Sequence, residues 1–441
     1  MNDVRLSDDE QLIYRQKQID FVSGLHGGSA WELLLLMTVL PLSLMAWSSM
    51  RRLIGNASRV SGSLLEAIFL FTVPSFSYMY PDYLLPLLFS LILLGISFPL
   101  TPATLPQQQQ HDQKAHHLPF VSAYRATLMI STCIAILAVD FIAFPRRFAK
   151  TETYGVSLMD LGVGSFVFAR GLIAIPEIPR SASQLARSSL PLILLGLIRL
   201  VTVKGSGYQE HVSEYGVHWN FFFTLAFISL WAGFTQRFHL THPLFSFGLI
   251  AAQQALLRGG LSHYVFDHPR YNLLHMNKEG LVSLLGYCAL YSIGQNVASF
   301  FYRTISKPVA AAPDLLKPLM QTILLGLTCW LLGVVADTHI EPCSRRLVNA
   351  SYIFFTSGYN LFVLGLFMFV SFISTTAVLP LVYQCVNQHQ LLVFLLANLM
   401  TGLVNFSINT IEYSHHAGFL IVQIYLLALF VSAHVAQRIK K

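Results

Sequence analysis

The sequence has few charged residues and no long polar stretch. Only 11% of its 441 residues are Asp, Glu, Lys or Arg, whereas 54% are hydrophobic. Soluble globular proteins carry roughly twice this proportion of charge, about 25%. Apolar segments recur along the whole length and leave no stretch long enough for a separate soluble domain. The composition therefore predicts a single integral membrane domain.

Several familiar signatures of catalysis and binding are also missing. The five cysteines are scattered without the Cys-x-x-Cys spacing of a metal site, so we expect buried thiols and no bound metal. The chain has no phosphate-binding loop, no Gly-x-Ser-x-Gly elbow and no zinc-protease helix. Its net charge of +7 comes mostly from basic residues at the ends of apolar segments. Membrane topology accounts for that distribution without nucleic acid as a partner.

The apolar runs predict an all-α polytopic membrane protein with about 13 transmembrane helices. A helix needs about 20 apolar residues to cross a bilayer core. The candidate spans lie at 31–47, 64–80, 83–100, 127–144, 157–174, 188–203, 219–235, 243–257, 280–300, 318–336, 350–372, 389–407 and 417–436. They form one domain over 31–436, which contains a low-complexity, Gln- and His-rich linker at 101–118. A polar segment at 1–30, without a visible cleavable signal peptide, precedes this domain, and a basic tail at 437–441 follows it.

The basic residues predict the orientation of the chain. Arg51 and Arg52 follow the first span, and the tail at 437–441 is basic, so both are expected in the cytoplasm. An odd number of spans then places the N-terminus on the opposite side. The loops after the fourth, sixth, eighth and tenth spans also face away from the cytoplasm. These loops hold nearly all of the unusual polar residues, whereas the connectors on the cytoplasmic side, which include the linker at 101–118, are plainer.

Two polar islands stand out, at 137–168 and at 204–220. The charges of the first island are Asp140, Arg146, Arg147, Lys150, Glu152 and Asp160. The polar and aromatic side chains of the second are Tyr208, Gln209, Glu210, His211, Glu214, Tyr215, His218, Trp219 and Asn220. Ionisable groups at membrane depth are costly to desolvate and indicate function by default. We interpret the two islands as opposite walls of one active site.

The residues of the first island each allow a structural and a functional interpretation. Asp140, near the end of the fourth predicted span, is either a helix-end carboxylate paired with Arg146 or Arg147, or a partly buried general base. The turn expected at Pro145 would bring Lys150 back over that carboxylate. The two arginines suit lipid headgroups or a phosphate.

Structural roles are expected for three further residues of this island. Asp160 is predicted to cap the N-terminus of the fifth span. Gly162 and Gly164 are predicted to permit close helix packing.

The histidines of the second island do not have a familiar zinc-ligand spacing, so the side chains of this island better suit hydrogen bonds to sugar or inositol hydroxyls.

The two islands resemble a known family of membrane enzymes. The strings AVDF…FPRRFAKTE.YG…MD.GVG.FVF and GYQEH..EYGVHWNFFFT are similar to those of the glycosylphosphatidylinositol (GPI) inositol acyltransferases, the PIG-W proteins of the endoplasmic reticulum. Weaker matches, NKEG..S.LGY at 277–287 and NL.TGL.N at 398–405, follow in the same order. The resemblance thus covers most of the chain, but neither 1–30 nor the linker.

The resemblance implies a multi-pass enzyme of the endoplasmic reticulum membrane with a luminal N-terminus and a cytoplasmic C-terminus. It implies transfer of a fatty acyl group, usually palmitoyl, from acyl-CoA to the inositol 2-hydroxyl of glucosaminyl-phosphatidylinositol. Acyl-CoA is then a substrate, and no permanently bound cofactor is expected. The alternative is a polytopic lipid or solute transporter, although such a protein should carry polar residues at the midplane of several spans, and most spans here are clean.

By similarity to the family, Asp140 and Lys150 are the expected catalytic pair. Asp140 would act as the general base, and Lys150 would stabilise the transition state or hold the donor. A histidine base, His211 or His218, is the second choice. The expected substrate-binding residues are Arg146, Arg147, Tyr154, Gln209, His211, Tyr215, His218, Trp219 and Asn220.

Overall fold

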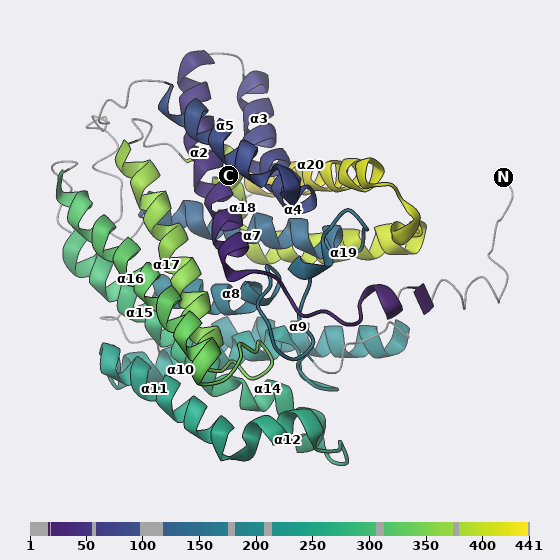
Figure 1. Cartoon of the computed structure of the whole chain (residues 1–441), viewed down its shortest axis with the longest axis vertical. Helices are drawn as coiled ribbons and strands as arrows, with labels where there is room; N and C mark the ends of the chain where they lie inside the picture. The colour runs from purple at the N-terminus through teal and green to yellow at the C-terminus, as the bar shows by residue number, and fades with distance from the viewer. Residues whose placement is uncertain are drawn as a thin grey trace, which may run out of the picture.

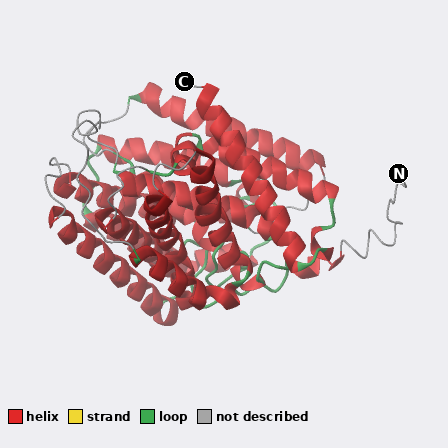
Figure 2. Ribbon diagram, turned by 90° about the horizontal axis from the view of Figure 1, so that it is seen from above, coloured by secondary structure: helices red, strands yellow, loops and turns green. Residues whose placement is uncertain are grey.

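The computed structural model is helical wherever it describes the chain. It describes residues 16–17, 19–54, 59–97, 118–174, 181–206, 214–305, 313–373 and 379–439. Within these ranges there are helices and loops but no strand (Figure 2). The expected all-α fold is therefore confirmed for the described residues. Residues 101–117 of the linker, together with Gln209 and His211, lie outside them.

Among the described residues, nine helical segments are long and apolar enough to cross a membrane. Two of them are compound: α3 (Arg59–Ala67) continues through a π-helical turn into α4 (Val73–Met79), and α14 (Lys278–Val282) leads into α15 (Leu284–Ile305). The other seven are α2 (Ala30–Ile54), α7 (Pro119–Ala138), α9 (Ala182–Ser206), α16 (Pro313–His339), α17 (Ala350–Ile373), α19 (Gln390–Ser407) and α20 (His415–Ile439). This arrangement is that of a polytopic membrane protein.

Four predicted spans correspond to shorter helices. These are α5 (Leu84–Ile96), α8 (Asp160–Leu172), α10 (Phe221–Arg237) and α11 (Pro243–Leu256), of 13, 13, 17 and 14 residues. At 1.5 Å per residue, each is shorter than a bilayer core of about 30 Å. Helices overlap every predicted span, but the count of thirteen stays a prediction. The short helices α12 (Ser262–Asp267), α13 (Leu273–Met276) and α18 (Leu381–Gln388) were not predicted.

The helix that leads to Asp140 differs from its predicted span at both ends. We predicted 127–144, whereas α7 runs from Pro119 to Ala138. It starts earlier because Arg125, a charge that the hydropathy pattern excludes, donates a hydrogen bond to Gln390 Oε1 over 2.9 Å. Asp140 therefore lies in the turn after the helix rather than within it.

Close helix packing surrounds the start of α8. A Cβ atom at Gly164 would come within 2.8 Å of the Tyr352 hydroxyl and of Thr356 Cγ2, so the predicted packing role of Gly164 is confirmed. Gly162 has no such neighbour within 4 Å, so the same prediction for Gly162 is wrong. At the other end of α8, Gly171 meets the backbone of α15 around Tyr291.

The two ends of the described chain pack against each other. In Figure 1 the early helix α4 lies beside α20, and the π-helical turn before α4 also contacts α20. Gln423 of α20 hydrogen-bonds to Thr72 over 2.9 Å and to Ser75 over 2.7 Å. The α7 helix is surrounded by α17, α18, α19 and α20. The loop that follows α7 is thereby held against the centre of the molecule.

Candidate active site

The loop between α7 and α8 is fixed by two other segments. Gly28 donates its backbone N–H to Val156 O over 2.9 Å, and Glu152 donates to Leu25 O over 3.1 Å. On the other side, Gly155 donates to Cys343 O over 2.8 Å. Gly155 has a φ of +127°, which a residue with a side chain rarely adopts. The loop is thus clamped between the segment before α2 and the segment before α17.

Asp140 is hydrogen-bonded to a side chain of α19. Its Oδ2 accepts from Asn405 Nδ2 over 2.9 Å. Burial raises the pKa of Asp140 to about 6, although the Asn405 hydrogen bond and the positive charge of Arg146 both act to lower it. The side chain keeps some exposure. At neutral pH it is therefore mostly a carboxylate, and it can still accept a proton.

Arg146 stabilises the end of α7 instead of forming an ion pair with Asp140. Its Nη2 donates to Val139 O over 2.7 Å and to Phe144 O over 3.0 Å. Its guanidinium carbon lies 3.8 Å from the ring centroid of Phe21, a cation–π contact. Burial lowers the pKa of Arg146 to about 10. These carbonyl contacts explain how the chain leaves the helix so soon before Asp140.

Arg147 already has a carboxylate partner. Its Nη2 lies 2.9 Å from Glu32 Oε1, and its Nε lies 3.0 Å from Glu32 Oε2, which is a bidentate pair with α2. Its side chain is 42% exposed. The structural interpretation, in which Asp140 pairs with one of the two arginines, is wrong for the described structure. A phosphate at Arg147 would have to displace Glu32.

Lys150 joins the two polar islands. Its Nζ lies 2.8 Å from Glu214 Oε1 and 3.1 Å from Glu214 Oε2. The two islands therefore do face each other, as the sequence predicts. The contact is not the expected one, however, because the ammonium of Lys150 contacts Glu214 and not Asp140. The lysine side chain is 40% exposed and accessible to a ligand.

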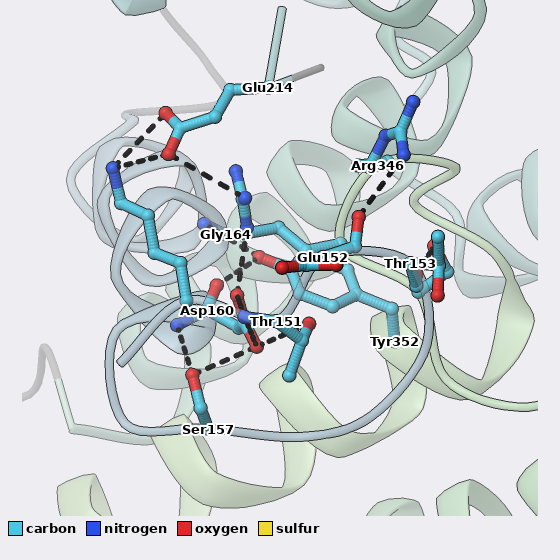
Figure 3. A network of polar contacts seen from close by, with 12 residues as sticks. Thr151, Glu152, Thr153, Ser157, Asp160, Gly164, Glu214, Arg346 and Tyr352 are labelled. Atoms are coloured by element: carbon cyan, nitrogen blue, oxygen red, sulfur yellow. Dashed lines mark hydrogen bonds and ion pairs between the residues drawn. The ribbon is translucent and has the colours of Figure 1, made fainter. Parts of the chain in front are cut away.

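Asp160 is the centre of a buried network and not a helix cap. Its carboxylate accepts from Thr151 Oγ1 over 2.9 Å, from Ser157 Oγ over 2.8 Å and from Arg345 Nε over 2.8 Å (Figure 3). The predicted capping role is wrong because the side chain turns back toward the 151–157 loop. Ser157 Oγ, in turn, accepts the Asp160 N–H over 3.1 Å.

The second island is organised by Asn277, which the sequence placed only in a weak motif. Asn277 Oδ1 accepts the backbone N–H groups of both His218 and Trp219, each over 2.9 Å. Gly216, at a φ of +116°, packs against the Asn277 backbone. The hydrogen bonds fix the direction of the segment that precedes α10.

The predicted binding residues of this island have structural partners. Asn220 caps α10 by accepting the Phe222 N–H over 3.0 Å. Trp219 Nε1 donates to Thr224 over 3.0 Å, and Tyr215 O accepts the Gly280 N–H over 2.9 Å. The ring of Tyr154, from the first island, lies 5.3 Å from that of Phe266.

Sequence reasoning missed Arg345 and Arg346. Arg345 contacts Asp160, and Arg346 Nη2 lies 3.2 Å from the fully buried Glu279. They are adjacent arginines in a loop expected to face away from the cytoplasm. That placement opposes the positive-inside trend, and the same signal drew attention to Arg146 and Arg147. A search of every such loop for basic residues that oppose this trend would have found both arginines.

The carboxylate of Asp140 and the ammonium of Lys150 are held by different parts of the fold. Asp140 is supported by α19, whereas Lys150 is supported by the Glu214 segment. Acyl transfer to a hydroxyl requires a proton acceptor and a positive charge, and these are the chemical groups that Asp140 and Lys150 carry. Among the described residues, no group of three or more His, Cys, Asp and Glu side chains could hold a metal ion.

Comparison with known proteins gives a consistent result. The GWT1 family model matches residues 14–436. A phosphatidylinositol-glycan biosynthesis class W protein of Dictyostelium discoideum is 31% identical, with 96% of this chain and 97% of the relative covered. A GPI-anchored wall transfer protein 1 of Yarrowia lipolytica is 40% identical, with 73% and 74% covered. An uncharacterized protein of Arabidopsis thaliana is also 40% identical, with 72% and 74% covered. The chain therefore belongs to the GWT1 family, the GPI inositol acyltransferases, and acts in GPI-anchor biosynthesis.

Proposed function

We propose that this protein transfers a fatty acyl group, usually palmitoyl, from acyl-CoA to the inositol 2-hydroxyl of glucosaminyl-phosphatidylinositol in the endoplasmic reticulum membrane. Family membership supports inositol acylation in general. The observation that carries the catalytic proposal is the carboxyl of Asp140, which is partly exposed, hydrogen-bonded to Asn405 and shifted to a pKa of about 6. A base of this strength is suited to work near neutral pH.

In the proposed reaction, the inositol hydroxyl oxygen attacks the thioester carbonyl carbon while Asp140 accepts the hydroxyl proton. The carbonyl oxygen becomes an oxyanion, and the ammonium of Lys150 stabilises it. The C–S bond then breaks, CoA leaves as a thiolate, and the proton held by Asp140 returns to solvent or to the leaving sulfur. The products are the inositol ester and CoA. His211 or His218 is the second choice for the base.

A direct transfer without an acyl-enzyme is favoured by the state of Cys343. This thiol lies in the loop that borders the site, and its side chain is buried. Burial raises the pKa of Cys343 well above its usual range, so it is not a reactive thiolate. The donor and the acceptor would therefore have to be bound together.

The remaining predicted residues enter the proposal as substrate contacts. They are Arg146, Arg147, Tyr154, Gln209, His211, Tyr215, His218, Trp219 and Asn220. We also propose thirteen spans, with the N-terminus luminal and the C-terminus cytoplasmic. The Lys150–Glu214 contact supports one part of this topology, which is that the loops after the fourth and sixth spans face the same side.

Acyl transfer by the purified protein tests the function. Labelled palmitoyl-CoA and glucosaminyl-phosphatidylinositol would be supplied in detergent, and lipid mass spectrometry would identify the product and the acylated position. We expect palmitate on the inositol ring and equimolar release of CoA. A well-folded protein that forms no acylated lipid would contradict the proposal and favour a lipid or solute transporter.

A further inference from the structure

The ion pair between Asp160 and Arg345 is almost completely buried. Their side chains are 2% and 4% exposed, and Asp160 Oδ1 lies 2.8 Å from Arg345 Nε. Thr151 and Ser157 supply further hydrogen bonds to the same carboxylate. Removing one partner of such a pair leaves an uncompensated buried charge. The Nε side of the Arg345 guanidinium is thus firmly anchored.

The other side of the guanidinium faces the second island. Arg345 Nη2 lies 3.8 Å from Glu214 Oε1, the same oxygen that lies 2.8 Å from Lys150 Nζ. The four side chains Asp160, Arg345, Glu214 and Lys150 alternate in charge. The charges in this row balance, so none of them lacks a counter-charge.

Exposure increases along this row from the anchor to the reactive group. The side chains of Arg345, Glu214 and Lys150 are 4%, 18% and 40% exposed. Lys150 is the member that a ligand can reach, whereas Arg345 is enclosed by protein. Arg345 therefore cannot act directly on a substrate from this position, but it can determine how strongly Glu214 holds Lys150.

We propose that Arg345 is a positioning residue for Lys150 that acts through Glu214, with Asp160 as its fixed support; this inference rests on the proposed acyl transfer. Glu214 divides its negative charge between two cations. Without the Arg345 contact, Glu214 attracts Lys150 more strongly, and the ammonium is less free to turn to the oxyanion or the donor. Arg345 also keeps Glu214 charge-balanced when Lys150 turns to its substrate.

Arg345→Lys tests this role more sharply than removal of the charge. A lysine can still neutralise Asp160, but as a point charge it cannot span Asp160 and Glu214 as a guanidinium fork does. The matched control is Arg346→Lys, the same change at the next residue, whose Nη1 and Nη2 atoms contact Glu152 O and Glu279. Both variants are made in the full-length protein, with and without Glu214→Gln.

The expected result is a coupling that depends on Glu214. Arg345→Lys lowers kcat about tenfold in the wild-type background and less than about twofold in the Glu214→Gln background, because the path through Glu214 is then absent. Arg346→Lys changes kcat by the same small factor in the wild-type and the Glu214→Gln backgrounds. An equal loss from Arg345→Lys in the two backgrounds, or no loss in either, would overturn the proposal.

A second readout does not depend on turnover. The rate at which Lys150 Nζ is modified by an imidoester, measured by peptide mass spectrometry, should fall in Arg345→Lys because Glu214 then attracts Lys150 more strongly. It should not fall in Arg346→Lys. An unchanged rate in Arg345→Lys would refute the positioning role even if no variant were active. Absence of product from the wild type, in contrast, would refute the proposed function itself.

Discussion

At the scale of single residues, the sequence identified the unusual charges but not their partners. Asp140 and Lys150 stand out because ionisable groups are rare in this chain. Their contacts, Asn405 and Glu214, lie 265 and 64 positions away along the sequence. Capping was predicted for Asp160 from its position alone, since a pattern cannot show that Arg345 would approach it. Pairing across a fold depends on tertiary packing, which a local pattern does not contain.

The pKa of Asp140 leads to a prediction for the pH dependence. The base is active as a carboxylate, so kcat/KM should rise with pH through about 6. Asn405 donates to the carboxylate and favours the charged form. Asn405→Leu should therefore raise the pKa and move this rise to higher pH.

Asn398→Leu is the matched control for that experiment. Asn398 lies on the same helix but is exposed and donates only to Phe394 O, over 2.7 Å. The pH profile of this variant should coincide with that of the wild type. A profile that Asn405→Leu leaves unchanged would argue against Asp140 as the group that titrates.

At the scale of helices, hydropathy located every long apolar element and misjudged several ends. The α7 helix starts earlier than predicted because Gln390 satisfies Arg125, and it stops earlier because Arg146 donates to the carbonyl of its C-cap residue, Val139. The hydropathy of a segment reflects the free-energy cost of moving each side chain from water into the membrane. It does not show that a charged side chain will be paired with a polar partner inside the helix bundle. The sequence predicted the same packing role for Gly162 and Gly164, but only Gly164 has close neighbours.

The crossing of α8 and α15 gives a prediction for stability. A Cβ at Gly171 would overlap the backbone carbonyl of Tyr291, and backbone cannot move aside as a flexible side chain can. Gly171→Ala should lower stability by roughly 1–3 kcal/mol. Gly162→Ala, on the same helix with open space around it, should be neutral or slightly stabilising. Thermal unfolding in detergent measures both, and equal melting temperatures would show that the helices do not cross this closely.

At the scale of the whole molecule, the islands meet because the helices between them return their loops to one end of the bundle. The sequence predicted this meeting from the parity of the spans and from the basic loops. It did not predict that the segment before α17 would complete the site with Arg345. Three distant segments converge at the 150–160 loop, and only the folded arrangement of α2, α8 and α17 brings them together.

The proposed topology can be tested independently of activity. An epitope tag at the N-terminus should be protected from protease in sealed microsomes, and a tag at the C-terminus should be digested. Detergent should make both tags accessible. Protection of the C-terminal tag, or digestion of the N-terminal tag before detergent is added, would contradict an odd number of spans with a luminal N-terminus.

The central claim is that Asp140 is the base for inositol acylation, and the most direct test is the turnover of purified Asp140→Asn. We predict that kcat falls by about 10²- to 10⁴-fold, with unfolding temperature preserved, because asparagine cannot accept the hydroxyl proton. Asp267→Asn, a carboxylate that is 62% exposed on α12, should keep wild-type turnover. Undiminished product from folded Asp140→Asn would contradict the account and direct attention to His211 or His218.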